Sequence, residues 1–160
     1  MTSPQNMSPS MGEPDDEAGE WVVASIGPRG FRTELAARGH ALVADEPARV
    51  GGTDAGPTPY ELLLAALGGC TVITLRMYAD RKGWPLEGAE VRLRTARSHE
   101  LDCERCETEP VGLAHIARRV VLTGPLTDEQ RARLLQIADR CPVKQTLERG
   151  MRVVAEAGRP

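Results

Sequence analysis

Short runs of alternating hydrophobic and polar residues fill the first third of the chain, a pattern typical of β-strands with one exposed face. We expect strands over residues 21–26, 31–37 and 40–44. The stretches Gly27-Pro28-Arg29-Gly30 and Arg38-Gly39 separate them with residues that favour turns. The three predicted strands therefore form a meander.

A glycine-rich loop over residues 50–59 leads into a much longer apolar segment. Thr58 can cap a helix, Pro59 suits its first position and Glu61 completes a capping box. The pattern predicts a helix over residues 59–82, ended by a glycine. Its first half is apolar on every face, which is typical of a helix buried on all sides. In a chain of 160 residues, we expect a second subunit to supply part of that cover.

Two adjacent glycines, Gly68 and Gly69, lie inside this predicted helix. Each costs the helix roughly 1 kcal/mol relative to alanine. We therefore expect another backbone to approach the helix closely at this point.

The remaining chain alternates between strand and helix patterns. Polar–apolar alternation predicts strands on both sides of a polar loop, while a capping box at Thr127 and a proline at position 142 each predict the start of a helix. The expected segments are strands over 89–95, 114–122 and 151–155, the loop 99–112, a helix from residue 127 and a short helix over 142–149. The order βββ-α-ββ-αα-β predicts an α+β fold rather than a doubly wound sheet.

Composition separates an N-terminal tail from the rest of the chain and indicates the cellular compartment and the classes of partner. Residues 1–20 are rich in Ser, Pro, Gly and acids, so we expect a disordered tail before one domain over residues 21–160. A net charge of −3 without a basic stripe, and an aromatic content of 3%, argue against nucleic-acid binding. The longest apolar run, residues 62–70, is too short for a bilayer, and the N-terminus lacks signal-peptide features. We expect a cytoplasmic protein that binds no membrane and keeps its four cysteines reduced.

Two cysteines carry the strongest candidate chemistry. Cys70 follows the apolar half of the long predicted helix, and Cys141 directly precedes Pro142 at the start of the short one. Free backbone N–H groups at a helix start stabilise a thiolate, and Lys144 one turn later either adds charge or is simply exposed. Both cysteines are also small apolar residues that often fill cores, so packing alone is the competing explanation. A working redox pair needs Cα atoms within roughly 7 Å of each other.

The residues around these cysteines resemble the OsmC/Ohr family of osmotically inducible and organic hydroperoxide resistance proteins. The similar stretches are Gly56-Pro57-Thr58-Pro59-Tyr60-Glu61-Leu62-Leu63 through Cys70, and Asp139-Arg140-Cys141-Pro142-Val143. The resemblance implies an OsmC-like fold, an antiparallel sheet around a buried central helix, in an intertwined homodimer with active sites at the interface. The Asp45-Glu46-Pro47 stretch and the Cys103/Cys106 loop resemble a less characterised branch of the family.

The resemblance also implies roles for individual residues. It implies thiol-dependent reduction of organic hydroperoxides, with Cys70 as the peroxidatic and Cys141 as the resolving residue. The reductant would be a dithiol of the lipoyl type, and we expect no cofactor. Leu63, Leu64 and Leu67 would form an apolar lining that favours organic hydroperoxides, although ordinary core packing explains the same leucines.

Two features of the family are hard to find here. The family's active-site glutamate directly follows the proline, where this chain has Tyr60; Glu61 comes one residue later, about 100° around the helix. The catalytic arginine has three candidates, Arg29, Arg32 and Arg38, of which Arg32 is favoured by its place in the second predicted strand. A peroxidatic thiolate needs positive charge nearby, and in the family the acid orients the arginine that supplies it. Because Tyr60 stands in place of that acid, it weakens the prediction of efficient peroxidase activity.

The stretch Cys103-Glu104-Arg105-Cys106 forms a second constellation. Its spacing suits two ligands of one zinc ion, which His99 and His115 would complete. A surface redox pair and an ordinary exposed loop stay open as alternatives. Asp45-Glu46-Pro47 is interpreted as a solvated turn, because acids before a proline at a strand end are usually exposed.

The sequence thus supports two functions. The first is a thiol-dependent peroxidase of oxidative-stress defence that works through Cys70 and Cys141. The second is a non-catalytic OsmC-like protein that binds a small apolar or thiol ligand and holds zinc in its CxxC loop. Tyr60 is the residue that favours the second function.

Overall fold

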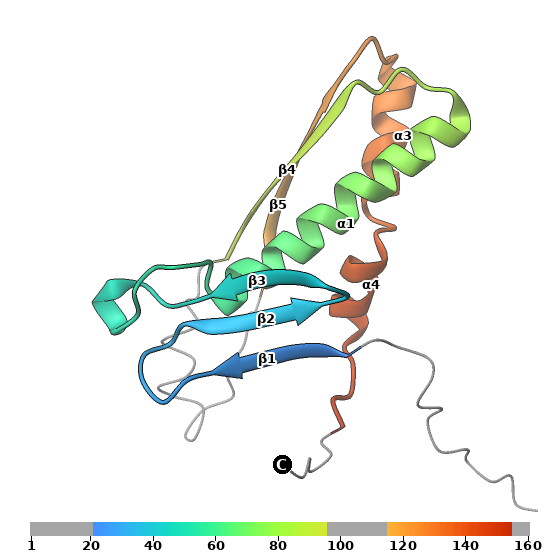
Figure 1. Cartoon of the computed structure of the whole chain (residues 1–160). Helices are drawn as coiled ribbons and strands as arrows, with labels where there is room; N and C mark the ends of the chain where they lie inside the picture. Colours follow the sequence, from blue (N-terminus) through green and yellow to red (C-terminus); the bar gives the residue numbers. More distant parts are fainter. Residues whose placement is uncertain (1–20, 96–114, 155–160) are drawn as a thin grey trace, which may run out of the picture.

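Two separate antiparallel sheets and three α-helices make up the part of the chain that the computed structural model describes, residues 21–95 and 115–154 (Figure 1). The three-stranded sheet lies near the start of the long helix α1, while the second sheet runs alongside it. The elements are β1 (Val22–Ile26), β2 (Thr33–Ala37), β3 (His40–Ala44), the 3-10 turn η1 (Ala48–Val50), α1 (Pro59–Lys82), β4 (Gly88–Arg94), β5 (Ala117–Thr123), α3 (Asp128–Ala138) and α4 (Pro142–Arg149). The predicted α+β class is confirmed.

The first sheet is the predicted meander, with the order β1-β2-β3. Ala37 pairs with His40, so only Arg38 and Gly39 connect β2 to β3. Both connecting residues have positive φ angles, 49° and 79°. A two-residue turn of this kind matches the right-handed twist of paired strands and explains why a glycine stands at its second position.

The start and end of α1 follow the predicted signals. The Thr58 N–H donates to Glu61 Oε2 at 2.8 Å, and the Glu61 N–H donates to Thr58 Oγ1 at 3.4 Å. This reciprocal capping box satisfies backbone donors that the first helical turn leaves open. At the other end, Gly83 adopts a left-handed conformation with φ 63°, and its N–H donates to the carbonyl groups of the last turn.

The core lies where α1 packs against α3 and the β4–β5 sheet. A stripe on α1 with a spacing of four residues is buried, and it comprises Leu67, Thr71, Leu75 and Ala79. The core cluster itself consists of Leu75, Ala79, Leu86, Leu126, Leu134, Ile137 and Ala138. On the opposite side of α1, Ile73 and Met77 are 59% and 67% exposed. The described part of a single chain therefore does not bury α1 on all sides, and the cover expected from a second subunit stays a prediction.

The two glycines of α1 also differ from the prediction. A Cβ atom at Gly68 would lie 3.1 Å from Leu93 Cδ1, so the close neighbour is a side chain of β4 rather than a backbone. A Cβ atom at Gly69 would meet no described atom within 4 Å. Among the described residues, Gly68 therefore has a close packing neighbour and Gly69 has none.

Length and composition alone would allow α1 to cross a membrane, because its 24 residues include a window with a mean hydropathy of 1.6. That window extends beyond the apolar run of residues 62–70. The core helix of a folded domain passes the same test, and α1 contributes Leu75 and Ala79 to the core described above. The contacts of α1 with β4, α3 and α4 favour a core helix.

The second sheet pairs β4 with β5 in antiparallel register, Gly88 opposite Thr123 and Arg94 opposite Ala117. Both strands start and end within a few residues of the predicted segments. The strand predicted over residues 151–155 is wrong for 151–154, which form no strand. Met151, Val153 and Val154 are mostly exposed. A strand needs a neighbouring strand to pair with, and an alternating pattern does not show whether such a neighbour is present.

Candidate thiol site

Cys70 and Cys141 come from two helices that pack against each other, α1 and α4. Cys70 is half-buried on α1, and Cys141 is the N-cap residue of α4, directly before Pro142. The Cys141 N–H donates to the Ala138 carbonyl at 3.4 Å, which fixes the tight turn between α3 and α4. The Cys141 side chain is fully buried, with 0% exposure, and both cysteines are free thiols.

The two thiols lie close enough to shift each other's pKa. Burial is the largest influence on the Cys70 thiol, and together with the neighbouring Cys141 sulfur it raises the pKa of Cys70. The backbone N–H of Val143 opposes this rise but does not cancel it.

Cys141 has the opposite balance. Burial raises the pKa of its thiol, but hydrogen bonds from Cys70, the Lys144 N–H, Thr71 and the Val143 N–H outweigh burial and lower that pKa below its ordinary value. The Thr71 hydroxyl already donates to the Leu67 carbonyl at 2.8 Å, and one proton cannot serve both acceptors. The fixed donors are therefore the backbone N–H groups that open α4, which place the negative charge on Cys141.

A cavity of about 520 Å³ is lined by residues of α1, α4 and the start of β5, and neither cysteine is among its described lining residues. Leu67 lies one turn before Cys70 on α1, and Lys144 is the residue whose N–H faces Cys141. The described lining comprises Leu63, Leu67, His115, Ile116, Arg118, Lys144, Leu147 and Glu148. The cavity thus combines an apolar wall with cationic groups and one carboxylate. Leu64, expected beside Leu63 in this wall, lines a different hollow on the far side of α1.

The cations of this cavity are already paired. Lys144 Nζ lies 2.7 Å from a Glu148 carboxylate oxygen and 3.7 Å from Asp139 Oδ1. The Arg118 guanidinium donates to Asp139 Oδ1 at 2.6 Å and to the Ala138 carbonyl at 2.9 Å. These contacts hold β5 against the turn that carries Cys141. Arg118 therefore helps to position this turn.

Sequence comparison decides the family. The profile of OsmC-like proteins matches residues 52–156, about two-thirds of the chain, and this range contains both thiols and the cavity lining. The chain belongs to the OsmC-like family. Among curated proteins, none gives a significant match to this OsmC-like chain.

Solved structures support the same fold. An OsmC-like protein from Mycoplasma pneumoniae has a TM-score of 0.65 and 19% identity, over 83% of this chain and 89% of that one. The organic hydroperoxide resistance protein OsmC from Legionella pneumophila has a TM-score of 0.58 and 20% identity, over 80% and 89%. An OsmC-like protein of unknown function from Vibrio cholerae has a TM-score of 0.61 and 13% identity, over 80% and 92%. At these identities, the likeness concerns the fold.

The acid and the arginine expected in an OsmC-like site are not supplied by the predicted residues. Glu61 is engaged in the capping box, as the sequence predicted, and Tyr60 occupies the first turn of α1. Arg32 Nη2 forms an exposed ion pair with Glu34 at 2.8 Å. Neither Arg32 nor the alternatives Arg29 and Arg38 are among the groups that shift the pKa of Cys70.

Asp45 is not part of a solvated turn, and this prediction is wrong. Its side chain is 1% exposed and accepts hydrogen bonds from the Thr53 hydroxyl at 2.5 Å, the Thr53 N–H at 3.0 Å and the Ala55 N–H at 3.1 Å. A fourth bond comes from the Glu46 N–H at 2.8 Å. These donors, the Thr53 hydroxyl first, lower the pKa of Asp45 to about 2. A charged Asp45 thus organises the loop that leads into α1.

Glycines complete this loop. A Cβ atom at Gly52 would lie 1.8 Å from the Glu46 carbonyl oxygen, and one at Gly56 would lie 2.3 Å from the Val43 carbonyl oxygen. No side chain fits at either position without moving the backbone. The glycine content of residues 50–59 was visible in the sequence, but the acid at its centre was not.

The zinc hypothesis lies mostly outside the described residues. His99, Cys103 and Cys106 belong to that undescribed stretch, whereas His115 is described and lines the cavity beside the thiols. Within residues 21–95 and 115–154, no group of three metal-ligating side chains occurs. The zinc site, the surface redox pair and the plain loop stay open for Cys103 and Cys106.

Proposed function

We propose that this OsmC-like protein is a thiol-dependent peroxidase that reduces organic hydroperoxides through Cys70 and Cys141. The observation that supports the proposal most strongly is that two free thiols shift each other's pKa in opposite directions. The half-buried Cys70 keeps its proton more readily than a free thiol, and the fully buried Cys141 loses its proton more readily. Such a pair can move a proton and form a disulfide without a metal or an organic cofactor.

The first half of the reaction oxidises Cys70. Its proton passes to the Cys141 thiolate as the Cys70 sulfur attacks the terminal oxygen of the hydroperoxide. The O–O bond breaks, which leaves a sulfenic acid on Cys70 and an alkoxide. The alkoxide takes the proton from Cys141 and leaves as the alcohol, so the Cys141 thiolate is restored.

The second half forms and reduces a disulfide. The Cys141 thiolate attacks the Cys70 sulfenic sulfur, the S–S bond forms, and hydroxide leaves and becomes water with a proton from solvent. An external dithiol of the lipoyl type then attacks the disulfide and is itself oxidised to a disulfide. The two cysteines regain their starting state, one thiol and one thiolate.

The adjoining cavity supports an organic hydroperoxide as substrate. Leu63 and Leu67 lie on the α1 face that leads to Cys70, and Ile116 and Leu147 face the same cavity. Burial of an apolar substituent against this wall favours binding by roughly 25 cal/mol per Å² of apolar surface removed from water, which hydrogen peroxide does not offer. The Legionella pneumophila protein is named for organic hydroperoxide resistance, which agrees with this substrate class.

A homodimer in the cytoplasm completes the proposal. Ile73 and Met77 are exposed on α1, and a hollow of about 380 Å³ beside them is lined by apolar residues that include Gly69, Val72 and Leu93. An apolar face of this kind on a core helix is typical of an interface. A second subunit seated there would complete the cover of α1, and it would offer a source for a cation beside Cys70, where the described residues of one chain supply none.

The proposal is tested by peroxide turnover. With cumene hydroperoxide and dihydrolipoamide, we expect Cys70→Ser to abolish turnover and Cys141→Ser to reduce it strongly. Cys103→Ser is the matched control, because it removes a thiol of the same chain from outside this pair. If neither Cys70→Ser nor Cys141→Ser lowers turnover, the peroxidase proposal fails.

A non-catalytic OsmC-like protein that binds a small apolar or thiol ligand is the second candidate. The observation that favours it is Tyr60 at the position of the family's acid, together with Glu61 held in the capping box. Mass spectrometry after exposure to one equivalent of cumene hydroperoxide separates the two. A Cys70–Cys141 disulfide supports the peroxidase, whereas an unchanged pair supports the binding protein.

A further inference from the structure

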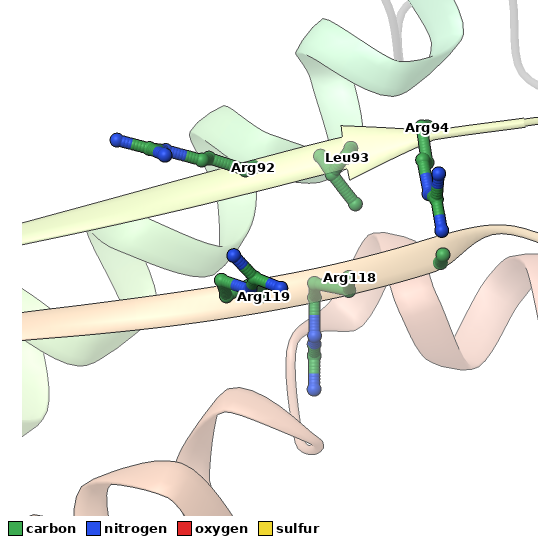
Figure 2. Close-up of a pocket in the computed structure, with 6 residues that line it drawn as sticks. Arg92, Leu93, Arg94, Arg118 and Arg119 are labelled. Carbon is green, nitrogen blue, oxygen red and sulfur yellow. The ribbon is translucent and has the colours of Figure 1, made fainter.

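Three arginines gather on one exposed face of the β4–β5 sheet and have no role in the thiol pair. Arg92 and Arg94 lie on β4, and Arg119 lies on β5 (Figure 2). Because side chains alternate along a strand, these three point away from the face that packs on α1. We call Arg92, Arg94 and Arg119 the arginine face.

The pairing register brings these charges together. Arg92 lies directly opposite Arg119, and Arg94 lies opposite Ala117 in the next pair of the same face. Like charges directly opposite each other destabilise an antiparallel pair. The small side chain of Ala117 leaves room between the guanidinium groups. The sheet therefore carries a local conflict of the kind that natural proteins keep at functional sites.

Little within the described chain neutralises this face. Glu90 pairs with Arg92 through its Nε atom. Arg94 and Arg119 form no ion pair with another described residue. The protein as a whole has a net charge of −3, so the cationic face is not the result of a general excess of basic residues. Considering the described residues alone, Arg94 and Arg119 have no ionic partner and Arg92 is partly compensated, which leaves this face available to an anion.

A hollow of about 390 Å³ includes all three arginines among its lining residues. Arg118 is also in the lining, but Figure 2 shows its side chain pointing away from the other three, toward the helices. Its guanidinium is occupied by Ala138 and Asp139. No aromatic residue is among the described lining residues, so the described part of the hollow offers no aromatic platform for a nucleobase.

We propose that Arg92, Arg94 and Arg119 form a binding site for the phosphate group of a small molecule. The planar guanidinium fork binds two phosphate oxygens at once, which makes arginine the preferred partner of phosphate groups. A compact anion with several charges would bridge Arg92 and Arg119 and turn their repulsion into attraction. The size of the hollow suits a phosphate or pyrophosphate group rather than a macromolecule.

Isothermal calorimetry with inorganic pyrophosphate tests the site at constant ionic strength. We expect binding by the wild type, and a weakening by about tenfold or more for Arg94→Gln and for Arg119→Gln. Arg29→Gln removes an arginine from an exposed turn of the first sheet and should leave binding unchanged. Arg94→Gln and Arg119→Gln should both keep the wild-type rate of peroxide turnover, because the thiol pair lies elsewhere.

A second measurement separates a built site from general attraction of anions. Arg119→Glu should raise the Tm in phosphate-free buffer, because it replaces a repulsive pair with an attractive one, and it should abolish the rise in Tm that pyrophosphate gives the wild type. Equal pyrophosphate binding by the wild type, Arg94→Gln and Arg119→Gln would overturn the proposal. Tighter binding of a single-stranded oligonucleotide than of pyrophosphate would also overturn it, in favour of a nucleic-acid surface.

Discussion

Cys70 and Cys141 influence each other's ionisation across the contact between α1 and the start of α4: the pKa of the Cys70 thiol is raised and that of the Cys141 thiol is lowered. The more accessible sulfur therefore keeps its proton to higher pH, and the fully buried sulfur is the first to ionise. A peroxidatic thiol needs both access and charge, and in this chain the two requirements are divided between two residues. The buried thiolate therefore has a chemical role as the proton acceptor for its partner.

The division of charge can be measured by thiolate absorbance near 240 nm. In a Cys103→Ser/Cys106→Ser background, we expect one thiolate per chain at a pH below the ordinary thiol pKa. Cys141→Ala should remove this thiolate, because it deletes the residue that the α4 N–H groups stabilise. Cys70→Ala should keep it but shift its titration to higher pH, because Cys141 loses a hydrogen-bond donor.

The two single variants control for each other, because each leaves one thiol of the pair. If Cys70→Ala rather than Cys141→Ala removes the thiolate of lowest pKa, the charge lies on Cys70. The proton would then have to be assigned to Cys141, and the first step of the proposed reaction would need no proton transfer.

Asp45 makes the stability of the loop before α1 dependent on pH. Its pKa lies at about 2 in the folded chain, below its ordinary value of 3.8. A lowered pKa means that the charged carboxylate stabilises the fold above pH 3.8 and that this contribution is lost as the pH falls toward 2. We expect Asp45→Asn to lower the Tm by roughly 5 °C at neutral pH, because an amide cannot accept all four hydrogen bonds.

Thermal melts monitored by circular dichroism between pH 2 and 5 check this prediction. The difference in Tm between the wild type and Asp45→Asn should shrink as the pH falls, because the wild-type carboxyl becomes neutral as well. Thr53→Val should move the acid transition of the wild type to higher pH, since it removes the strongest donor to Asp45. Equal melting of the wild type and Asp45→Asn at neutral pH would mean that the buried carboxylate is not needed for the loop.

Local signals allowed much of the fold to be predicted, because their causes lie within a few residues. The capping boxes at Thr58 and Thr127 place both helix starts, and the Arg38-Gly39 turn places two strands. Asp45 was misjudged because its hydrogen-bond partners lie 8 and 10 residues away in a loop without a repeating pattern. The alternation in residues 151–154 was misleading, because it shows a tendency to form a strand but does not show whether a neighbouring strand is available for pairing.

The site could be predicted only in part. The start of α4 indicated a stabilised thiolate at Cys141, and the family resemblance indicated Cys70, but the direction of their hydrogen bond depends on burial in three dimensions. The arginine face had no sequence signal, because Arg92 and Arg119 are 27 positions apart and meet only through the register of β4 and β5. Pairing register across a long connection cannot be inferred from local alternation.

Glu61 is predicted to stabilise α1 without taking part in peroxide reduction. Thr58→Ala should cost about 1 kcal/mol, or a Tm shift of roughly 2–4 °C, because it removes the cap. Thr127→Ala is the matched control, since it removes the same kind of cap from α3. Glu61→Gln keeps an acceptor for the Thr58 N–H and should leave both Tm and turnover close to wild type. If Glu61→Gln loses most of its turnover without a change in Tm, Glu61 serves as the acid of the site.

Gly69→Ala tests the proposed dimer, because the direction of its change in Tm depends on whether a second subunit covers α1. In an isolated chain, Gly69→Ala meets no atom within 4 Å and should stabilise α1 by roughly 1 kcal/mol, because alanine favours helix. If a second subunit packs closely on this face, the added methyl group collides with it, and both the Tm and the dimer fraction fall. We expect the second result, measured by thermal melts and sedimentation velocity. Met77→Lys, at a side chain that is 67% exposed in one chain, should likewise produce monomers. A monomeric wild type, together with a higher Tm for Gly69→Ala, would show that the apolar face of α1 is not covered by a second copy.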